Sequence, residues 1–304
     1  MRSKSLYIIF YIIIYGFISV IFPAGLLAKN KPTKITILFT NDTHSRIEPF
    51  SKNDTKFPNL GGYARRAELI KKIRQQEPNV MLFDAGDVFQ GTPYFNFFGG
   101  ELEFKLMSLM GYTAMNMGNH DFDAGLNGLL KQLPNATFDI ISSNYDFSET
   151  VLKDKIQPYK IYNVAGVKVG VFGLGVGLQG LVSAVNYGKT HYINPLEKAA
   201  GMAYLLKKEK KCDLVICLSH LGFSYEDQQV SDVVLAKQSK NIDIIIGGHT
   251  HTFIDKPYVF KNSDNENIVI GQVGWGGIKI GRIDVFFSEK NGIKIEGLSA
   301  LEIF

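Results

Sequence analysis

Five short apolar segments of this chain each end in a cluster of residues of the types that bind metals. The segments cover 35–40, 80–83, 114–117, 214–218 and 242–246, and the clusters after them are Asn41-Asp42-Thr43-His44, Asp84-Ala85-Gly86-Asp87, Gly118-Asn119-His120-Asp121, Ser219-His220 and Gly247-Gly248-His249-Thr250-His251. Short apolar runs of this kind predict buried strands of a largely parallel sheet. Ligand sites of open α/β sheets lie beyond the carboxyl ends of their strands. We therefore expect five distant segments to meet at one crevice.

The segments between these runs have the spacing of amphipathic helices. Apolar side chains recur at helical intervals among charged ones in 62–76, 102–110 and 196–210. Pro78 suits the end of the first of these helices, and Pro195 suits the start of the last. Alternating strands and helices indicate an α/β fold.

After Thr252 the pattern changes to β-rich runs separated by turn-forming residues. These runs lie around Val259 and over 268–273, 278–287 and 293–303. A second sheet that packs on the first is therefore expected in this part of the chain.

Composition and charge exclude several classes of protein. The 304 residues are 45% hydrophobic and 20% charged, which is typical of a folded chain and not of a disordered one. Without residues 1–28 the chain carries 31 basic and 29 acidic side chains. So balanced a charge gives no reason to expect a nucleic acid partner. One catalytic domain over residues 29–304 is expected.

The amino terminus has the pattern of a secretory signal peptide. Arg2 and Lys4 precede an apolar stretch over 6–27, which closes at the small residue Ala28. A stretch of this length also suits an uncleaved membrane anchor. Both interpretations predict an exported protein, periplasmic or extracellular, and contact with a membrane only if the segment is retained.

The chain has two cysteines, Cys212 and Cys217. If both lie on the strand before His220, their spacing places them on opposite faces and roughly 16 Å apart, too far for a disulfide. They are expected to be buried free thiols.

The clusters contain the ligands of a metal centre without a thiolate. Asp42 and His44 are two residues apart, so on an extended segment both side chains point to one side. Further oxygen and imidazole ligands come from Asp87, Asn119, His220, His249 and His251. Seven such ligands are too many for one tetrahedral ion and suit two ions that share a carboxylate.

Together these motifs resemble those of the calcineurin-like metallophosphoesterases. Within that family the segments Gly61-Gly62, Gln90-Gly91-Thr92-Pro93 and Asn119-His120-Asp121-Phe122-Asp123 look like the branch of the 5′-nucleotidases and UDP-sugar hydrolases. The resemblance covers nearly all of the chain after residue 28. It implies a four-layered α/β sandwich, two mixed β-sheets flanked by α-helices, with a dinuclear site at one end.

Carried over residue by residue, the resemblance implies which side chains bind each ion. Asp42, His44 and His251 would hold the first ion, Asn119, His220 and His249 the second, and Asp87 would bridge them. Two ions so placed activate a bridging hydroxide for attack on phosphorus. His120 would be the catalytic histidine, with Asp123 orienting its ring. Manganese, zinc, iron and cobalt all suit such mixed ligands.

Several residues outside this set have two interpretations. Arg46 and Asn144 either approach the phosphate or make structural hydrogen bonds. Tyr94, Phe95, Phe97 and Phe98 either form an apolar wall beside the site or belong to the core. His191, outside every motif, is expected to be structural.

The chain departs from the family in two places. Ser45 stands where the family usually has glycine, and we expect residues 29–304 to lack the second domain that binds the nucleoside in the nucleotidases. A nucleotide or another phosphorylated small molecule is the expected substrate, and a separate polypeptide that supplies the second domain is an expected partner. The alternative activities are a broad or cyclic-nucleotide phosphodiesterase and, in another class, a non-enzymatic metal-bound scaffold.

Overall fold

The computed structural model describes residues 32–304 except 228, 257 and 291. The predicted signal peptide at residues 1–28 lies outside the described residues. Within the described part, no helix combines the length and the apolar character needed to cross a bilayer.

In the described residues, most strands belong to two six-stranded mixed sheets. The first sheet has the order β14 (Gly292–Glu302), β13 (Lys279–Ser288), β1 (Thr33–Thr40), β2 (Val80–Asp84), β3 (Ala114–Asn116) and β4 (Asp139–Ile141). The second has the order β11 (Tyr258–Lys261), β12 (Asn267–Gly271), β10 (Ile244–Ile246), β9 (Leu214–His220), β7 (Val167–Gly175) and β6 (Tyr159–Val164). A short antiparallel pair joins β5 (Tyr145–Asp146) and β8 (His191–Tyr192).

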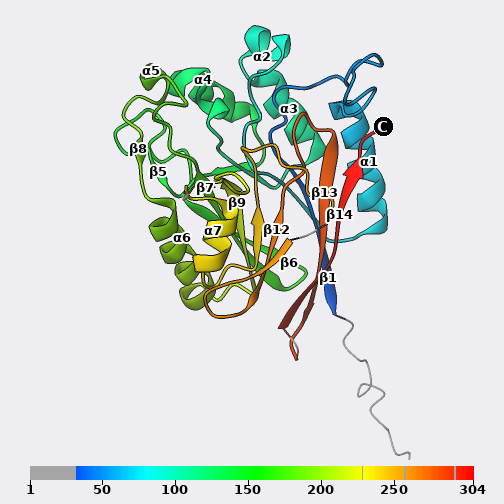
Figure 1. The fold of residues 1–304 in the computed structure, drawn as a ribbon, viewed down its shortest axis with the longest axis vertical. Coiled ribbons are helices and arrows are strands. Elements are labelled where there is room, and N and C mark those ends of the chain that lie inside the picture. Colours follow the sequence, from blue (N-terminus) through cyan, green and yellow to red (C-terminus); the bar gives the residue numbers. More distant parts are fainter. Residues whose placement is uncertain (1–31, 228, 257, 291) are drawn as a thin grey trace, which may run out of the picture. The chain divides into compact units, whose positions relative to one another are not determined.

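The helices lie outside the two sheets, and in Figure 1 α2, α4 and α5 are at the upper end of the picture. They are α1 (Tyr63–Gln76), α2 (Pro93–Phe98), α3 (Glu101–Met110), α4 (Gly125–Gln132), α5 (Ala184–Tyr187), α6 (Pro195–Tyr204) and α7 (Asp232–Gln238). Short 3₁₀ turns lie at η1 (His120–Phe122) and η2 (Leu133–Asn135), and a π-helical turn, η3 (Leu205–Glu209), extends α6. In Figure 1, α6 and α7 lie on one outer side of the strands and α1 on the other.

Three apolar layers separate these elements and produce the four-layered sandwich. The middle layer lies between the two sheets and contains Ile37 of β1 and Ile216 of β9. One outer layer packs α1, α3 and α4 on the first sheet, and the other packs α6 and α7 on the second. Residues of β1 alternate between two layers, since Ile37 faces the other sheet and Leu38 faces the helices. The predicted fold class is confirmed.

The five predicted strands are present, but they do not share one sheet. β1, β2 and β3 pair in parallel in the first sheet, while β9 and β10 pair in parallel in the second. The strands after Thr252 do not form a sheet of their own either, because β13 and β14 extend the first sheet and β11 and β12 extend the second. A strand buried on both faces has the same apolar sequence in either sheet, so composition does not assign it to one.

The predicted helices and thiols are found with small differences. The helices expected over 62–76, 102–110 and 196–210 are α1, α3 and α6 with its π-helical extension. Asn194 caps α6 by accepting hydrogen bonds from the backbone N–H groups of Leu196 and Glu197. Cys212 and Cys217 are buried and free. They lie in the same outer layer and not on opposite faces, because Cys212 precedes the start of β9.

A cluster of four charges joins the end of α1 to the first sheet. Lys34 Nζ lies 2.6 Å from Glu77 Oε1 and 3.2 Å from Asp284 Oδ2, and an Arg282 nitrogen lies 2.5 Å from Glu77 and 3.0 Å from Asp284. The hydrogen bond from Lys34 lowers the pKa of Glu77 below its ordinary value of 4.5, against the opposing effect of burial. Ionised Glu77 therefore stabilises the folded state.

We predict that Glu77→Gln lowers the free energy of unfolding by about 1 kcal/mol at neutral pH. A lowered folded-state pKa gives stability that is present above pH 4.5 and is lost as the pH falls through the folded-state value. The difference between the variant and the wild type should therefore shrink in acid. Urea unfolding at pH 7 and near pH 3 measures it. Glu68→Gln is the matched control, since Glu68 is largely exposed and lies 3.9 Å from Lys72; an equal effect of both substitutions would contradict the prediction.

Candidate dinuclear metal centre

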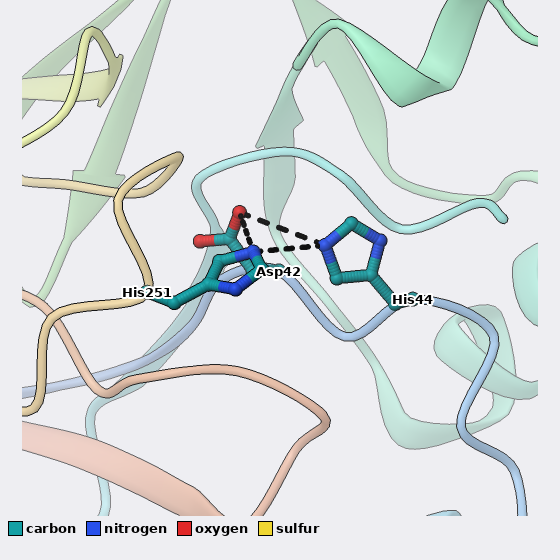
Figure 2. Close-up of side chains that lie close together, drawn as sticks. All are labelled: Asp42, His44 and His251. Atoms are coloured by element: carbon teal, nitrogen blue, oxygen red, sulfur yellow. Dashed lines mark hydrogen bonds and ion pairs between the residues drawn. The ribbon is translucent and has the colours of Figure 1, made fainter. Parts of the chain in front are cut away.

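The loops after β1 and β10 bring three predicted ligands together (Figure 2). His44 Nε2 lies 3.0 Å from His251 Nε2, and His251 Nε2 lies 3.4 Å from Asp42 Oδ1. Asp42 and His44 are buried, and His251 is partly exposed. Three donor atoms that converge at such distances have the arrangement of a metal site.

A second group of predicted ligands lies beside the first. Asp87, after β2, His220, at the end of β9, and His249, after β10, place their ligand atoms within 4.8 Å of one another. Asp87 Oδ2 is 3.0 Å from His220 Nε2 and 4.0 Å from His44 Nε2. Asp87 is therefore placed between the two groups, as expected of a shared carboxylate.

Asn119 is the seventh predicted ligand. Its Oδ1 atom is buried, and no described residue donates a hydrogen bond to it. His220 Nε2 is also buried, and it lies 3.0 Å from Asp87 Oδ2. A buried polar atom without a partner costs free energy, and a bound cation would relieve that cost at Asn119 Oδ1.

Strained backbone marks the same positions. Five of the seven predicted ligands have left-handed φ angles, which non-glycine residues seldom adopt: 49° at Asp42, 47° at His44, 58° at Asp87, 74° at His249 and 53° at His251. Each such residue costs on the order of 1–3 kcal/mol and is typical of functional sites. The strained backbone at these residues directs their side chains toward one point.

Backbone carbonyl groups hold two of the imidazole rings in a defined orientation. His220 Nδ1 lies 2.9 Å from the carbonyl oxygen of Ala85, and His44 Nδ1 lies 3.2 Å from that of Phe89. A carbonyl oxygen only accepts, so each ring donates through Nδ1 and directs Nε2 into the cluster. This is the arrangement by which metal-binding histidines are fixed.

The electrostatics of the cluster suit a divalent cation. Burial raises the pKa of Asp87, but the charge of His220 lowers it by more. The pKa of Asp87 is therefore below its ordinary value. Burial opposes a charge on His220, yet Asp87 raises the pKa of His220 to about 10. A proton thus balances the buried carboxylate, and a cation would supply the same balance. Burial lowers the pKa of His249 to about 4, which keeps that ring neutral and able to bind a metal.

Asp121 positions the loops that carry these ligands, a role that the motif alone did not reveal. Its fully buried carboxylate accepts hydrogen bonds from the backbone N–H groups of Asp87, Val88 and Gly118, at 3.0, 3.0 and 2.8 Å. Gln272 has a similar role for the loop after β10, since its side chain accepts from Thr252 N at 2.5 Å and donates to Gly248 O at 2.8 Å. The sequence gives no signal for this positioning role, because the partners of both side chains are backbone groups.

His120 and Asp123 form the predicted pair beside the cluster. His120 Nδ1 lies 2.8 Å from Asp123 Oδ2, and the backbone N–H of His120 donates to Asp87 Oδ1 at 2.8 Å. The hydrogen bond to Asp123 raises the pKa of His120, against the opposing effect of burial. The ring is therefore protonated more readily than an ordinary histidine, as a general acid requires.

The residues with two interpretations are now distinguished. Buried Asn144 is structural, because its side chain bonds both to the N–H and to the C=O of Gly175, at 2.7 and 2.8 Å. His191 lies on the surface at 3.2 Å from Glu149. The Arg46 side chain donates no hydrogen bond to any residue that the structure describes, and its guanidinium lies over the rings of Phe50 and Trp275.

The chain belongs to the calcineurin-like phosphoesterase family, since residues 35–253 match that family's sequence profile. The resemblance inferred from the motifs is thereby confirmed. Calcineurin-like phosphoesterases use two divalent metal ions, and the two groups of side chains described above are the candidate sites for them.

Several proteins named 5′-nucleotidase are similar to the chain. It is 35% identical over 301 residues to the snake venom 5′-nucleotidase of Gloydius brevicauda. This alignment covers 91% of the chain and 49% of the venom protein. It is 32% identical over 287 residues to the 5′-nucleotidase of Rattus norvegicus, and this alignment covers 86% of the chain and 48% of the rat protein. The crystal structure of a 5′-nucleotidase precursor from Thermus thermophilus superposes on the chain with a TM-score of 0.81 at 32% sequence identity. The superposition covers 89% of the chain and 55% of the precursor. The chain thus spans about half the length of these relatives.

We predict that Gly118→Ala weakens the binding of divalent cations about tenfold or more. A Cβ atom at this position would lie 2.2 Å from Asp87 Oδ1 and 2.7 Å from His220 Nε2, so both side chains would have to move. Calorimetric titration with Mn²⁺ measures the affinity.

Gly201→Ala, within α6, is the matched control for this substitution. Its Cβ would meet nothing within 4 Å, so the cation affinity should not change, while the free energy of unfolding rises by about 0.5–1 kcal/mol. Unchanged Mn²⁺ affinity in Gly118→Ala would show that the cation binds elsewhere.

Proposed function

We propose that this chain hydrolyses phosphomonoesters at the centre described above, with 5′-nucleotides as its substrates. The observation that carries the proposal is the position of Asp87, which contacts ligands of both groups and also accepts a hydrogen bond from the backbone of His120. One buried carboxylate thus connects two candidate metal sites to a protonatable histidine. This combination serves phosphoryl transfer, which needs positive charge around the phosphate and a proton donor for the leaving oxygen.

The assignment of ligands follows the two groups. Asp42, His44 and His251 would hold one ion, Asn119, His220 and His249 the other, and Asp87 would contact both. When bound, the ions polarise the phosphoryl oxygens and lower the pKa of a water molecule. The protein's own contribution is the fixed orientation of the donors, which the hydrogen bonds of His220 to Ala85 and of His44 to Phe89 provide.

His120 is assigned the protonation of the leaving oxygen. Asp123 accepts a hydrogen bond from the Nδ1–H group of His120, so the other ring nitrogen, Nε2, carries the proton that is transferred to the leaving oxygen. About a third of the His120 side chain is exposed, 34%, so a substrate reaches it from solvent. A non-enzymatic scaffold would have no need of such a pair, which favours the enzyme over that alternative.

The nucleotide specificity rests on the relatives. The proteins named 5′-nucleotidase that match this chain are about twice as long as the aligned segment, and the remainder of those proteins lies outside the alignment. A substrate-binding domain on a separate polypeptide remains a proposal, and copurification of a second protein with this chain would support it. Full activity on 5′-AMP without such a partner would exclude it.

We predict that His120→Asn lowers kcat for 5′-AMP by about 10²–10⁴-fold in the Mn²⁺-loaded protein. The reason is the loss of the proton donor for a poor leaving group, the ribose 5′ oxygen. p-Nitrophenyl phosphate leaves as a stable phenolate and needs little protonation, so its kcat should fall much less. Phosphate release from the two substrates measures this difference.

His191→Asn is the matched control, because His191 is an exposed histidine outside the centre. It should leave both rates unchanged. An equal loss on both substrates in His120→Asn would assign His120 a role other than acid catalysis. Hydrolysis of a cyclic nucleotide to the nucleoside monophosphate, without phosphate release from 5′-AMP, would favour the phosphodiesterase alternative.

A further inference from the structure

An open groove of about 540 Å³ lies beside the metal centre and has no role in the chemistry above. Its volume is within the range of sites that bind small organic molecules. Apolar and aromatic side chains from the segment after β1 and from α2 make up most of its lining: Ile47, Pro49, Pro93, Tyr94, Phe97 and Phe98.

The aromatic wall of the groove is exposed and is not part of the core. Phe97 is 82% exposed and Phe98 48% exposed, whereas Phe95 on the same helix stacks on buried Phe89. Phe95 therefore belongs to the core, whereas Phe97 and Phe98 form an apolar wall beside the site. Large exposed aromatic side chains gathered at a groove are typical of binding sites.

The groove is joined directly to the loop that carries His44. Gly91, in its lining, packs so closely on this loop that a Cβ atom would lie 2.9 Å from the carbonyl oxygen of His44. Thr92 donates a hydrogen bond to the carbonyl oxygen of Ser45 at 2.6 Å. A substrate whose phosphate lies at the metal centre therefore has its organic part within reach of the groove.

Arg46 connects the groove to the metal centre on a second path. Its guanidinium lies 4.2 Å from the ring centroid of Phe50 and 5.9 Å from that of Trp275, and Trp275 stacks on His251 at 5.8 Å with an interplanar angle of 13°. Among the described residues it pairs with no carboxylate, and its Nε atom is buried without a partner. An unpaired cation at this position complements the charge of a phosphate ester.

The charge at the other side of the groove favours an uncharged occupant. Glu48 also lines the groove, and its carboxylate accepts a hydrogen bond from the Tyr94 hydroxyl at 2.8 Å. A second phosphate would be repelled by this carboxylate, whereas hydroxyl and amino groups would bond to it. The lining thus suits a flat organic group with hydrogen-bond donors.

We propose that this groove binds the aromatic base of the phosphoester substrate, stacked on Phe97 and Phe98, while Arg46 faces the phosphate end. The proposal rests on the proposed function and adds a site of specificity within this chain itself. Stacking of a base on aromatic side chains strengthens binding about tenfold or more. A base subsite here would give this chain selectivity for nucleotides without a second domain.

A second cavity of about 460 Å³ is the competing location for the base. It lies near the catalytic pair, because Asn186 in its lining donates a hydrogen bond to the carbonyl oxygen of Asp123. Its lining includes Val185, which is 85% exposed, and the Lys189–Glu149 ion pair, but no aromatic ring. Stacking therefore favours the groove at Phe97.

The test compares 5′-AMP with ribose 5-phosphate, which have the same leaving oxygen and differ in the base. In the Mn²⁺-loaded chain we expect kcat/KM to be about tenfold or more higher for 5′-AMP. The double substitution Phe97→Ala with Phe98→Ala should remove this preference by raising KM for 5′-AMP, with kcat and the rate on ribose 5-phosphate unchanged. Both side chains are exposed, so the variant is expected to fold, and thermal unfolding checks this.

Val185→Ala is the control, because it truncates an exposed apolar side chain in the competing cavity. The expected result is an unchanged preference. Loss of the preference in Val185→Ala, or its retention in the double variant, would overturn the proposal. Equal hydrolysis of both substrates by the wild type would also overturn it while leaving the proposed function intact.

Adenosine binding gives a readout that does not depend on turnover. Calorimetry should give a Kd for adenosine that rises about tenfold in the double variant, while ribose binds weakly to both proteins. If neither phosphate ester were hydrolysed, the proposed function would fail, and adenosine binding lost in the double variant would still support the groove. Adenosine binding that the double variant retains would place the base elsewhere.

Discussion

The buried carboxylate of Asp121 is the contact on which the candidate centre depends. By accepting hydrogen bonds from the backbone of Asp87, Val88 and Gly118, it ties the loop after β2 to the loop after β3. Burial and the charge of Asp87 raise the pKa of Asp121 to about 7. The hydrogen bonds from the backbone N–H groups act in the opposite direction and offset part of the cost of burying this carboxylate. Asp87 and His120 keep their relative positions because their loops share this one acceptor.

The rigid sandwich allows the loops above it to be strained. Left-handed backbone at five predicted ligand positions would relax in a flexible loop, but here each loop leaves a strand buried on both faces. Glycines at the closest approaches serve the same purpose. At Gly86, with φ of 101°, a Cβ atom would lie 2.5 Å from the backbone nitrogen of Gly118. Strain and close packing thus bring imidazole and carboxylate groups to one point that unrestrained chains would keep apart.

Much of the local structure could be predicted from the sequence. The five strands and the principal helices follow from apolar runs and helical spacing, and the pairing of His120 with Asp123 follows from the family resemblance. The division of the strands between two sheets could not, because a run such as Ile244–Ile246 is equally apolar beside β9 or beside β3. Which strands form hydrogen bonds to one another depends on the packing of the whole chain. For the same reason the positioning roles of Asp121 and Gln272, whose partners are backbone groups, could not be recognised in the sequence.

The sequence by itself determined the chemical character of this protein: which side chains could bind metals, at which strand ends they lie, and which histidine has a carboxylate three residues away. Tertiary structure decided which of those side chains lie next to one another. It placed His220 of the second sheet 3.0 Å from Asp87 of the first, left Phe97 and Phe98 exposed along a groove, and set Arg46 beside Trp275. These relations join residues far apart in the chain, and only the packing of two sheets face to face brings them within contact distance.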